Sequence, residues 1–508
     1  MSRRISILAT IILLLFAVVV SQAANIQFFR APALNASANN PRNLNTSGTF
    51  PRGEIIAADG TVLAESVKEN VPLIPYRRVY PDGSLTSGVV GFSSHWYGNW
   101  ALEDEYNQYL TAHQQPPQSF EQLLAPTSAA DSVVLTLYPA LQRIARANFK
   151  GKDGAAVVIV PKTGAILALY SNPTYNPIPL TSPSDRIAKT AWNRYLTRDS
   201  DGFEPLGLVA TQQTFPPGST FKVITTAAAV AYKPADVFKV FTPNRKGRTC
   251  TTLPQTTKEL CNSGFVPCGG TIAAMLPVSC DPGYALLGLD LGADIMFKAA
   301  TSFGFNSIPP IDLPTMAGGA VASYFPSAGS FSNDLPALAY SSIGQQNVRA
   351  SALQDALVAA AIGNGGVEMT PHLMSYIASP SGKILKHYKN SVWKTPLTTS
   401  QDAQIVPLMR SVVTQGTASG VGLLAQDDVA CKTGTAQTGN QKMQTDDWLI
   451  CFAPATNPTV AVAVVVPFQP TAFFGAPVAG PILKCLLEAA LAIQSHLPAT
   501  GTATTCSS

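Results

Sequence analysis

The longest run without a charged residue lies at the start of the chain, from Ile5 to Ala24, directly after Arg3 and Arg4. About 20 apolar residues in a helix span about 30 Å, the thickness of the hydrocarbon core of a bilayer. The preceding arginines predict an N-terminus on the inner side of the membrane, with the rest of the chain on the outer side. We therefore expect a single-pass membrane protein with its anchor in residues 1–24. Ser21 to Ala23 also has the small residues of a signal-peptidase site, but the run exceeds the roughly 7 to 15 apolar residues of a signal peptide, which favours a retained anchor.

Residues 25–134 are more polar, and they are rich in proline and asparagine between Asn35 and Pro51. Short strand-like pieces follow, of which Gly53 to Ala64 has a typical two-residue turn at Asp59-Gly60. This pattern predicts a stalk with a small mixed α/β module.

Longer apolar elements begin near Leu135. The pattern predicts helices at Tyr138–Asn148, Thr225–Tyr232, Leu353–Ile362 and Pro481–Ser495, and strands at Ala155–Val160, Ala165–Ser171, Val429–Ala436, Trp448–Ala453 and Thr459–Val466. Because strands stand at both ends of a long helical middle, we expect an α+β domain over residues 135–496 whose sheet is completed by distant segments. The small polar residues 497–508 are expected to form a flexible tail.

The composition excludes several classes of protein. A chain of 508 residues has room for two or three domains, and with 46% hydrophobic and 13% charged residues it must bury apolar surface rather than remain disordered. The net charge of +4 is spread along the chain without a basic block, so we expect no nucleic-acid partner. Scattered histidines and the absence of a C-x-x-C pair argue against a zinc site.

Most cysteines stand in two contexts. Four fall close together, at Cys250, Cys261, Cys268 and Cys280. In an oxidising external compartment these four are expected to pair, and sequence order leaves all three connectivities open. Cys431, Cys451 and Cys485 lie in apolar stretches, and we expect them to be buried core residues.

The first candidate chemistry lies where Pro216 to Lys222 (PPGSTFK) leads into the helix-forming run Val223–Tyr232. A serine at a helix N-terminus lies near free N–H groups that can stabilise an oxyanion. Lys222 follows Ser219 by one helical turn and so shares its face, and a partly desolvated lysine there can act as base for the hydroxyl. The spacing alone is weak, because Ser391 and Lys394 share it without an apolar helix behind them.

The second candidate is Lys432-Thr433-Gly434-Thr435 in a predicted strand. A lysine on a strand edge offers a fixed cation for a substrate carboxylate, and the glycine lets another backbone approach closely. Lys162-Thr163-Gly164 repeats the letters, but it precedes Ser219 and is expected to be a plain hairpin turn. Between the two candidates comes Ser279-Cys280-Asp281.

In this order the three segments resemble the S-x-x-K, S-x-N and K-T-G motifs of penicillin-binding proteins and serine β-lactamases. The chain resembles class B penicillin-binding proteins over nearly its whole length, most closely the short actinobacterial type called penicillin-binding protein A. The resemblance extends to Phe215–Ala229, Ala285–Gly288, Ser342–Gln345, Asn364–Gly366 and Phe452–Pro454, and upstream to Arg52–Ile55, Asp59-Gly60, Leu102-Glu103 and Tyr106. It implies an antiparallel sheet flanked by helices, an all-helical part and a dimerisation-like N-terminal module.

The implied activity is cross-linking of peptidoglycan stem peptides by a D,D-transpeptidase that needs no cofactor or metal. Ser219 would attack the penultimate D-Ala carbonyl, Lys222 would take its proton, and Ser279 would relay a proton to the leaving amine. The N–H groups of Ser219 and Thr435 would hold the oxyanion, while Lys432, Thr433 and Thr435 would hold the terminal carboxylate.

The resemblance also implies partners and a location. β-Lactams would acylate Ser219, a separate glycan polymerase would work beside the enzyme, and the chain would sit in a bacterial plasma membrane. It favours the disulfides Cys268–Cys280 and Cys250–Cys261.

Asp281 stands where the family usually has asparagine. A carboxylate accepts hydrogen bonds only, and beside Lys222 it would favour the charged lysine and oppose its role as base. We expect an active but altered enzyme. The alternatives are a catalytically impaired or β-lactam-sensing protein, and a D,D-carboxypeptidase or β-lactamase that deacylates Ser219 with water. Asp446 is a second departure, where the family often has histidine.

Overall fold

The structure, a computed structural model, describes residues 2–25, 50–69, 75–114, 128–243, 249–263, 266–315, 318–439, 444–470, 475–495 and Cys506. Residues 26–49 of the predicted stalk, and the predicted tail except Cys506, lie outside the described residues.

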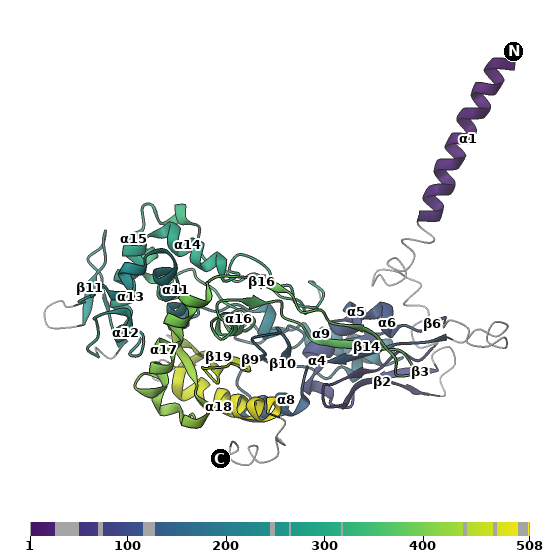
Figure 1. The fold of residues 1–508 in the computed structure, drawn as a ribbon. Helices are drawn as coiled ribbons and strands as arrows, with labels where there is room; N and C mark the ends of the chain where they lie inside the picture. The colour runs from purple at the N-terminus through teal and green to yellow at the C-terminus, as the bar shows by residue number, and fades with distance from the viewer. Residues whose placement is uncertain are drawn as a thin grey trace.

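An N-terminal helix, α1 (Ser2–Ala24), covers the predicted anchor and is drawn apart from the body in Figure 1. Its apolar side chains are exposed, for example Leu13 at 69% and Phe16 at 67%. In the part of the chain whose side chains are described, α18 (Gly475–Gln494) is long and apolar enough to cross a membrane and Thr10–Ala24 of α1 is a shorter apolar stretch, but 56% of the apolar window of α18 is buried inside the protein. Because α18 packs on the central sheet, its apolar side chains belong to the hydrophobic core.

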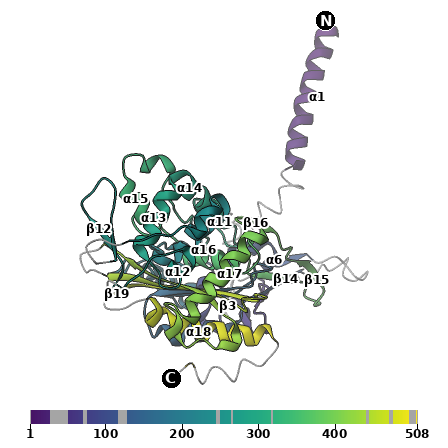
Figure 2. The same ribbon diagram turned by 60° about the vertical axis from the view of Figure 1, so that its left-hand side comes forward.

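A five-stranded antiparallel sheet in the order β10–β9–β19–β18–β17 forms the centre of the C-terminal part. Its strands are β9 (Gly154–Ile159), β10 (Ile166–Asn172), β17 (Ala430–Gln437), β18 (Gln444–Ala453) and β19 (Val460–Pro470). They are buried almost throughout because α8 (Pro139–Phe149) and α18 cover one face and α16 (Ala352–Ile362) covers the other (Figures 1 and 2). This arrangement confirms the predicted α+β fold with a sheet built from distant segments.

The predicted start of the last helix at Pro481 is wrong, since α18 begins at Gly475 and Pro481 lies inside it. Proline is tolerated in the first turn of a helix, and one turn further on it removes a single hydrogen bond. Burial of the apolar face of α18 outweighs that loss.

A six-stranded sheet in the order β15–β14–β8–β1–β2–β3 joins the N-terminal part to later segments. Its strands are β1 (Ile55–Ile56), β2 (Val62–Lys68), β3 (Tyr76–Val79), β8 (Ser132–Leu135), β14 (Met374–Ala378) and β15 (Ile384–His387). Strands β1 and β2 form the antiparallel hairpin predicted around Asp59-Gly60, while β1 and β8 pair in parallel. The chain therefore returns to the N-terminal sheet after it has formed most of the helical part.

The N-terminal part contains a buried ion-pair network. The Glu103 carboxylate accepts hydrogen bonds from Arg52 Nε at 2.9 Å, Arg78 Nε at 2.6 Å and the Tyr80 hydroxyl at 3.1 Å. Its charge is thus balanced although its side chain has no exposed surface.

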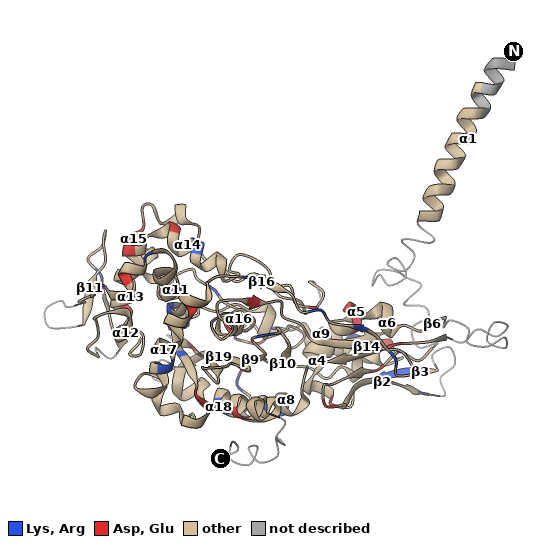
Figure 3. Cartoon of the chain, in the orientation of Figure 1, with Lys and Arg blue, Asp and Glu red and all other residues tan. Residues whose placement is uncertain are grey.

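Short elements complete the N-terminal part: η2 (Gly83–Leu85), α4 (Ser87–Val90), β4 (Phe92–Ser94), β5 (Gly98–Trp100), α5 (Leu102–Glu105), α6 (Asn107–Leu110), β6 (His113–Gln114) and β7 (Ser128–Ala129). The remaining elements are η3 (Ile178–Thr181), α9 (Asp185–Tyr195), α10 (Val209–Gln212), η4 (Gly218–Phe221), α11 (Lys222–Tyr232), η5 (Pro234–Phe238), β11 (Cys250–Thr252), β12 (Glu259–Cys261), α12 (Ile272–Met275), α13 (Asp281–Leu291), α14 (Ala293–Ser302), η7 (Ala328–Phe331), α15 (Leu335–Ser341), β13 (Glu368–Met369), β16 (Val392–Lys394), α17 (Thr399–Thr414), η8 (Ser419–Val421) and η9 (Ala425–Asp427). Helices α11 and α13–α15 gather into the helical part in Figure 1, and charged residues of both signs are scattered over the elements in Figure 3.

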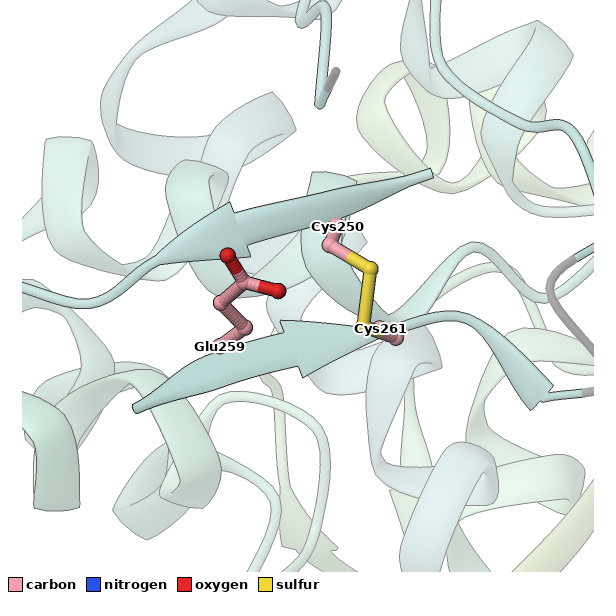
Figure 4. A group of neighbouring side chains, drawn as sticks. All are labelled: Cys250, Glu259 and Cys261. Atoms are coloured by element: carbon pink, nitrogen blue, oxygen red, sulfur yellow. A yellow bond between two sulfur atoms is a disulfide. The ribbon is translucent and has the colours of Figure 1, made fainter. Parts of the chain in front are cut away.

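The two expected disulfides, Cys250–Cys261 and Cys268–Cys280, are present. Cys250 and Cys261 are opposite each other on β11 and β12, and Glu259 lies beside them (Figure 4). The three side chains are close enough to surround an ion, but both sulfur atoms are used in the disulfide and offer no thiolate.

The expectation that Cys431, Cys451 and Cys485 are buried is confirmed, but each is also half of a disulfide that the sequence did not predict. Cys431 and Cys451 are directly opposite each other on β17 and β18 and form a disulfide. Cys485 on α18 is bonded to Cys506, beyond the last described helix. The strand register, which brings Cys431 to Cys451, is not visible in the spacing of the residues along the chain.

Candidate active site

Ser219 lies in the 3₁₀ turn η4, and α11 begins directly after this turn at Lys222. The turn starts at Gly218, whose φ of +54° belongs to the left-handed region that favours glycine. The Gly218 N–H donates to the carbonyl of Gly344 at 2.9 Å, which ties the turn to the segment after α15. The serine is thus held in a fixed turn in front of a buried helix.

Lys222 has no exposed side-chain surface, and its ammonium makes three hydrogen bonds. The acceptors are the Ser279 carbonyl at 2.8 Å, Ser279 Oγ at 3.2 Å and Asp281 Oδ1 at 2.6 Å. Burial lowers the pKa of Lys222, and the charge of Asp281 and the hydrogen bond to it act in the opposite direction.

Ser279 and Asp281 lie on either side of Cys280, which precedes α13 and is bonded to Cys268. Ser279 has a φ of +56°, an uncommon conformation for a residue with a side chain. The Asp281 N–H donates to Asn262 Oδ1 at 3.1 Å. The disulfide and this hydrogen bond fix the segment that presents Ser279 and Asp281 to Lys222.

Lys432 projects from β17 into the same group of side chains. Its ammonium donates to Ser279 Oγ at 2.8 Å and to the carbonyl of Thr433 at 2.9 Å. Ser279 Oγ therefore lies between the two lysines. Burial and repulsion from Lys222 hold the pKa of Lys432 well below its usual value, and Asp281 opposes this shift.

Of the remaining residues of the strand motif, Gly434 faces the nucleophile turn. A Cβ atom on Gly434 would lie 2.7 Å from the carbonyl oxygen of Pro217, so the backbone that approaches this glycine is that of the segment just before Ser219. Thr433 Oγ1 is hydrogen-bonded to Thr417 Oγ1 at 2.6 Å, and Thr435 Oγ1 accepts from the Gly475 N–H at 2.9 Å.

Two further segments, Ser391–Lys394 and Lys162–Gly164, match the motif sequences but have other roles in the structure. Lys394 belongs to β16, and Ser391 just before it donates to Thr370 Oγ1 at 2.9 Å. Lys162 donates to Asn457 Oδ1 at 2.6 Å from the turn between β9 and β10. Among the described residues, neither segment contributes a hydrogen bond to the group around Ser219.

Some residues around the site were not expected from the sequence. Asp355 on α16 is buried, and its Oδ2 lies 2.7 Å from Thr220 Oγ1, next to the nucleophile. Burial raises the pKa of Asp355 to about 7. Asn262 and Thr417 also support the motifs, and no sequence signal distinguishes these three from ordinary polar residues.

Asp446, the second departure from the family pattern, lies opposite Ala436 across β17 and β18. Its Oδ1 accepts a hydrogen bond from the Phe468 N–H at 3.1 Å. Burial is the main cause that raises the pKa of Asp446 to about 7. Asp446 therefore holds the start of β18 to the end of β19 and, within the described part of the chain, makes no hydrogen bond to the group around Ser219.

Comparison with protein families gives two matches on adjacent parts of the chain. The penicillin binding protein transpeptidase domain matches residues 154–488, and the penicillin binding protein A dimerisation domain matches residues 52–131.

Individual proteins are similar over almost the whole chain. Peptidoglycan D,D-transpeptidase PbpA of Mycobacterium tuberculosis is 32% identical over 509 residues, covering 96% of this chain and 98% of that protein. The protein of the same name from Mycolicibacterium smegmatis is 32% identical over 501 residues, covering 95% and 98%.

Solved structures of penicillin-binding protein A from M. tuberculosis are similar in fold. The ceftriaxone acyl-enzyme has a TM-score of 0.77 at 32% identity, covering 88% of this chain and 99% of that one. The penicillin G acyl-enzyme has a TM-score of 0.75 at 32% identity, covering 87% and 99%.

Proposed function

The chain belongs to the penicillin-binding protein transpeptidase family, and we propose that it is a peptidoglycan D,D-transpeptidase in which Ser219 forms the acyl-enzyme. The observation that carries this proposal is the continuous hydrogen-bonded group that links the three motifs, with Ser279 Oγ between Lys222 and Lys432. Ser219 contacts this group through Asp281 Oδ1 at 3.5 Å.

Acyl transfer requires a nucleophile, donors for the oxyanion and a route for one proton. The backbones of the nucleophile turn and β17 are adjacent, since a Cβ atom on Gly218 would lie 2.8 Å from the Thr435 carbonyl oxygen. The N–H groups of Ser219 and Thr435 are therefore suited to hold the oxyanion that forms when Ser219 Oγ attacks the penultimate D-Ala carbonyl. When the tetrahedral intermediate collapses, the C–N bond breaks and Ser279 gives a proton to the leaving D-Ala amine.

The terminal carboxylate of the donor peptide is assigned to Lys432, Thr433 and Thr435. A lysine beside hydroxyl groups supplies charge-assisted hydrogen bonds to a carboxylate. The amine of a neighbouring stem peptide then attacks the acyl-enzyme, forms the cross-link and frees Ser219. A β-lactam carries both the reactive carbonyl and the carboxylate, so it acylates Ser219 in place of the donor.

We further propose that α1 is retained as a membrane anchor with the rest of the chain outside the cell. Its length of 23 residues and its exposed apolar side chains support insertion into a bilayer. Residues 25–134 then form the stalk and N-terminal module, residues 135–496 the transpeptidase domain and residues 497–508 the tail. A separate glycan polymerase in the same membrane would supply the strands to be cross-linked.

Intact-mass spectrometry after a short exposure to benzylpenicillin tests the acyl-enzyme. We expect one adduct that persists for many minutes and is absent from Ser219→Ala. Rapid loss of the adduct would indicate a β-lactamase, and no adduct would indicate an impaired or silent protein.

A second assay tests transfer against hydrolysis. A D-Ala-D-Ala donor peptide is incubated with and without an amine acceptor, and the products are separated by mass. Formation of the joined peptide supports the transpeptidase, whereas hydrolysis alone indicates a D,D-carboxypeptidase.

A further inference from the structure

We propose that the carboxylate of Asp281, and not the amine of Lys222, accepts the proton of Ser219 during acylation. This inference rests on the proposed function, because it assigns the first proton transfer of the same reaction. It makes Asp281 a catalytic residue and gives Lys222 the role of carrying the proton onward to Ser279.

The hydrogen bonds of Lys222 support this assignment. An ammonium has three N–H donors, and those of Lys222 are matched by three acceptors, two on Ser279 and one on Asp281. To act as base, Lys222 would need a free lone pair directed at Ser219. In the described part of the chain, the hydrogen bond of Ser219 Oγ is instead with Asp281 Oδ1 at 3.5 Å. That distance is long, but catalytic hydrogen bonds commonly shorten when substrate binds.

The charges of the site point the same way. Asp281 contacts Lys222 at 2.6 Å and forms an ion pair with it, whereas the contacts of Lys432 are with Ser279 and with the carbonyl of Thr433. Removing the proton from Lys222 would leave the carboxylate beside a neutral, fully buried amine, without its counter-charge. Burial lowers the pKa of both lysines, and it is Lys222 whose direct contact with the Asp281 carboxylate opposes this shift.

The contacts form an unbroken route for the proton. Ser219 Oγ bonds to the carbonyl carbon while its proton moves to Asp281 Oδ1. When the C–N bond breaks, Ser279 Oγ gives its proton to the leaving nitrogen, Lys222 restores that proton over 3.2 Å, and Asp281 restores the proton of Lys222 over 2.6 Å. The net change moves one proton from Ser219 to the leaving amine, and all three carriers return to their initial states.

Asparagine at this position could not take part, because an amide does not accept a proton at neutral pH. Asp281→Asn is therefore expected to return the role of base to Lys222. This contrast allows a direct test in which Lys222→Met is made both in the natural chain and in the Asp281→Asn variant. The acylation rate constant is measured in each protein with a fluorescent penicillin, and circular dichroism verifies folding.

The factor by which Lys222→Met slows acylation should be at least ten times smaller in the natural chain than in Asp281→Asn. We expect a difference of this size because general-base catalysis contributes about 10²- to 10⁴-fold. An equal loss in both backgrounds would overturn the inference. If the natural chain forms no adduct with Ser219, the proposed function itself fails. Asp290→Asn, at the other end of α13 and paired with Lys239 at 2.6 Å, is the matched control and should leave the rate unchanged.

The pH dependence gives an independent readout that requires no change at Lys222. Carboxylates ionise at a lower pH than that at which ammonium groups lose a proton. The acylation rate of the natural chain should therefore reach half its maximum at least one pH unit below that of Asp281→Asn. Coinciding profiles would contradict the inference, even if the lysine variants fail to fold.

Discussion

The carboxylate of Asp281 lies 2.6 Å from the ammonium of Lys222, and the lysine side chain is completely buried. Removing one member of a buried ion pair costs about 3–5 kcal/mol, because the other charge is left without its partner. Asp281 keeps 25% of its side chain exposed, which reduces that cost. We expect Asp281→Ala to lower the free energy of unfolding by about 2 kcal/mol.

Urea denaturation followed by tryptophan fluorescence measures this loss. Asp281→Asn should lose less than half as much, since its carbonyl oxygen still accepts a hydrogen bond from Lys222. The same loss in both variants would show that the charge of Asp281, and not the hydrogen bond that asparagine retains, supplies the stability at this position.

The disulfide Cys268–Cys280 holds the residue between Ser279 and Asp281. Replacing both cysteines with serine releases a loop with a sequence separation of 12 residues, for which chain entropy predicts a loss of about 3 kcal/mol. Because Ser279 and Asp281 move with Cys280, we also expect acylation of Ser219 to slow at least tenfold. Fluorescent-penicillin labelling of the folded fraction measures that rate.

The matched control is the double serine variant of Cys250 and Cys261, whose sequence separation is 11 residues. It should lose similar stability and slow acylation less, because Cys261 reaches the motif segment through the hydrogen bond of the neighbouring Asn262 to the Asp281 N–H and not through the chain itself. Equal slowing in both variants would mean that the helical part as a whole, and not the segment at Cys280, positions the site.

Sequence patterns predicted the long elements well. Strands such as β9 and β19 are apolar almost throughout, and a helix such as α16 has an equally apolar sequence, so length and residue type were enough to identify them. Strand order and register could not be predicted from the sequence, because they depend on contacts between segments that are distant along the chain. The disulfide of Cys431 and Cys451 was missed for this reason, since it requires the register of β17 against β18.

The motif serines and lysines were identified by spacing and context, but their contacts were not. The sequence left open whether Asp281 interacts with Lys222, Lys432 or neither. The structure places its hydrogen bond on Lys222, since the positive φ of Ser279 and the start of α13 direct the chain there. Asp355 was not identified, since nothing in α16 distinguishes it from other helical aspartates.

Gly434 gives a prediction about the fit between β17 and the nucleophile turn. An added Cβ would lie 2.7 Å from the Pro217 carbonyl oxygen and 2.9 Å from Thr220 Cγ2, and the first of these is a backbone atom that cannot rotate away. Gly434→Ala must therefore separate β17 from the turn, and we expect acylation to slow at least tenfold.

Stopped-flow acylation with a chromogenic cephalosporin measures this change. Gly420→Ala is the control, because a Cβ at Gly420 meets nothing within 4 Å. If Gly434→Ala acylates as fast as Gly420→Ala, the contact with Pro217 does not determine the position of the oxyanion donors.

The hydroxyl of Thr220, next to the nucleophile Ser219, contacts the buried carboxyl group of Asp355, whose protonation affects the stability of the protein. Thr220 Oγ1 lies 3.0 Å from the Pro217 carbonyl oxygen and 2.7 Å from Asp355 Oδ2. A hydroxyl has one hydrogen, so when it donates to Pro217 the carboxyl group must be protonated and donate to it. This agrees with burial, which raises the pKa of Asp355 from 3.8 to about 7.

A carboxyl group whose pKa is raised by folding keeps its proton in the folded protein and loses it in the unfolded chain between about pH 4 and pH 7. Stability from this group therefore falls as the pH rises through that window and is constant above it. Asp355→Asn mimics the protonated form, so its advantage over the natural chain should grow with pH to roughly 4 kcal/mol, since the pKa rises from 3.8 to about 7 and one pKa unit corresponds to about 1.4 kcal/mol. Urea unfolding at pH 4.5, 6 and 8 measures the difference, with Asp294→Asn on the exposed surface of α14 as control. A difference that does not change with pH would mean that Asp355 is ionised in the folded protein and that Thr220 donates to it, leaving the Pro217 carbonyl without this donor.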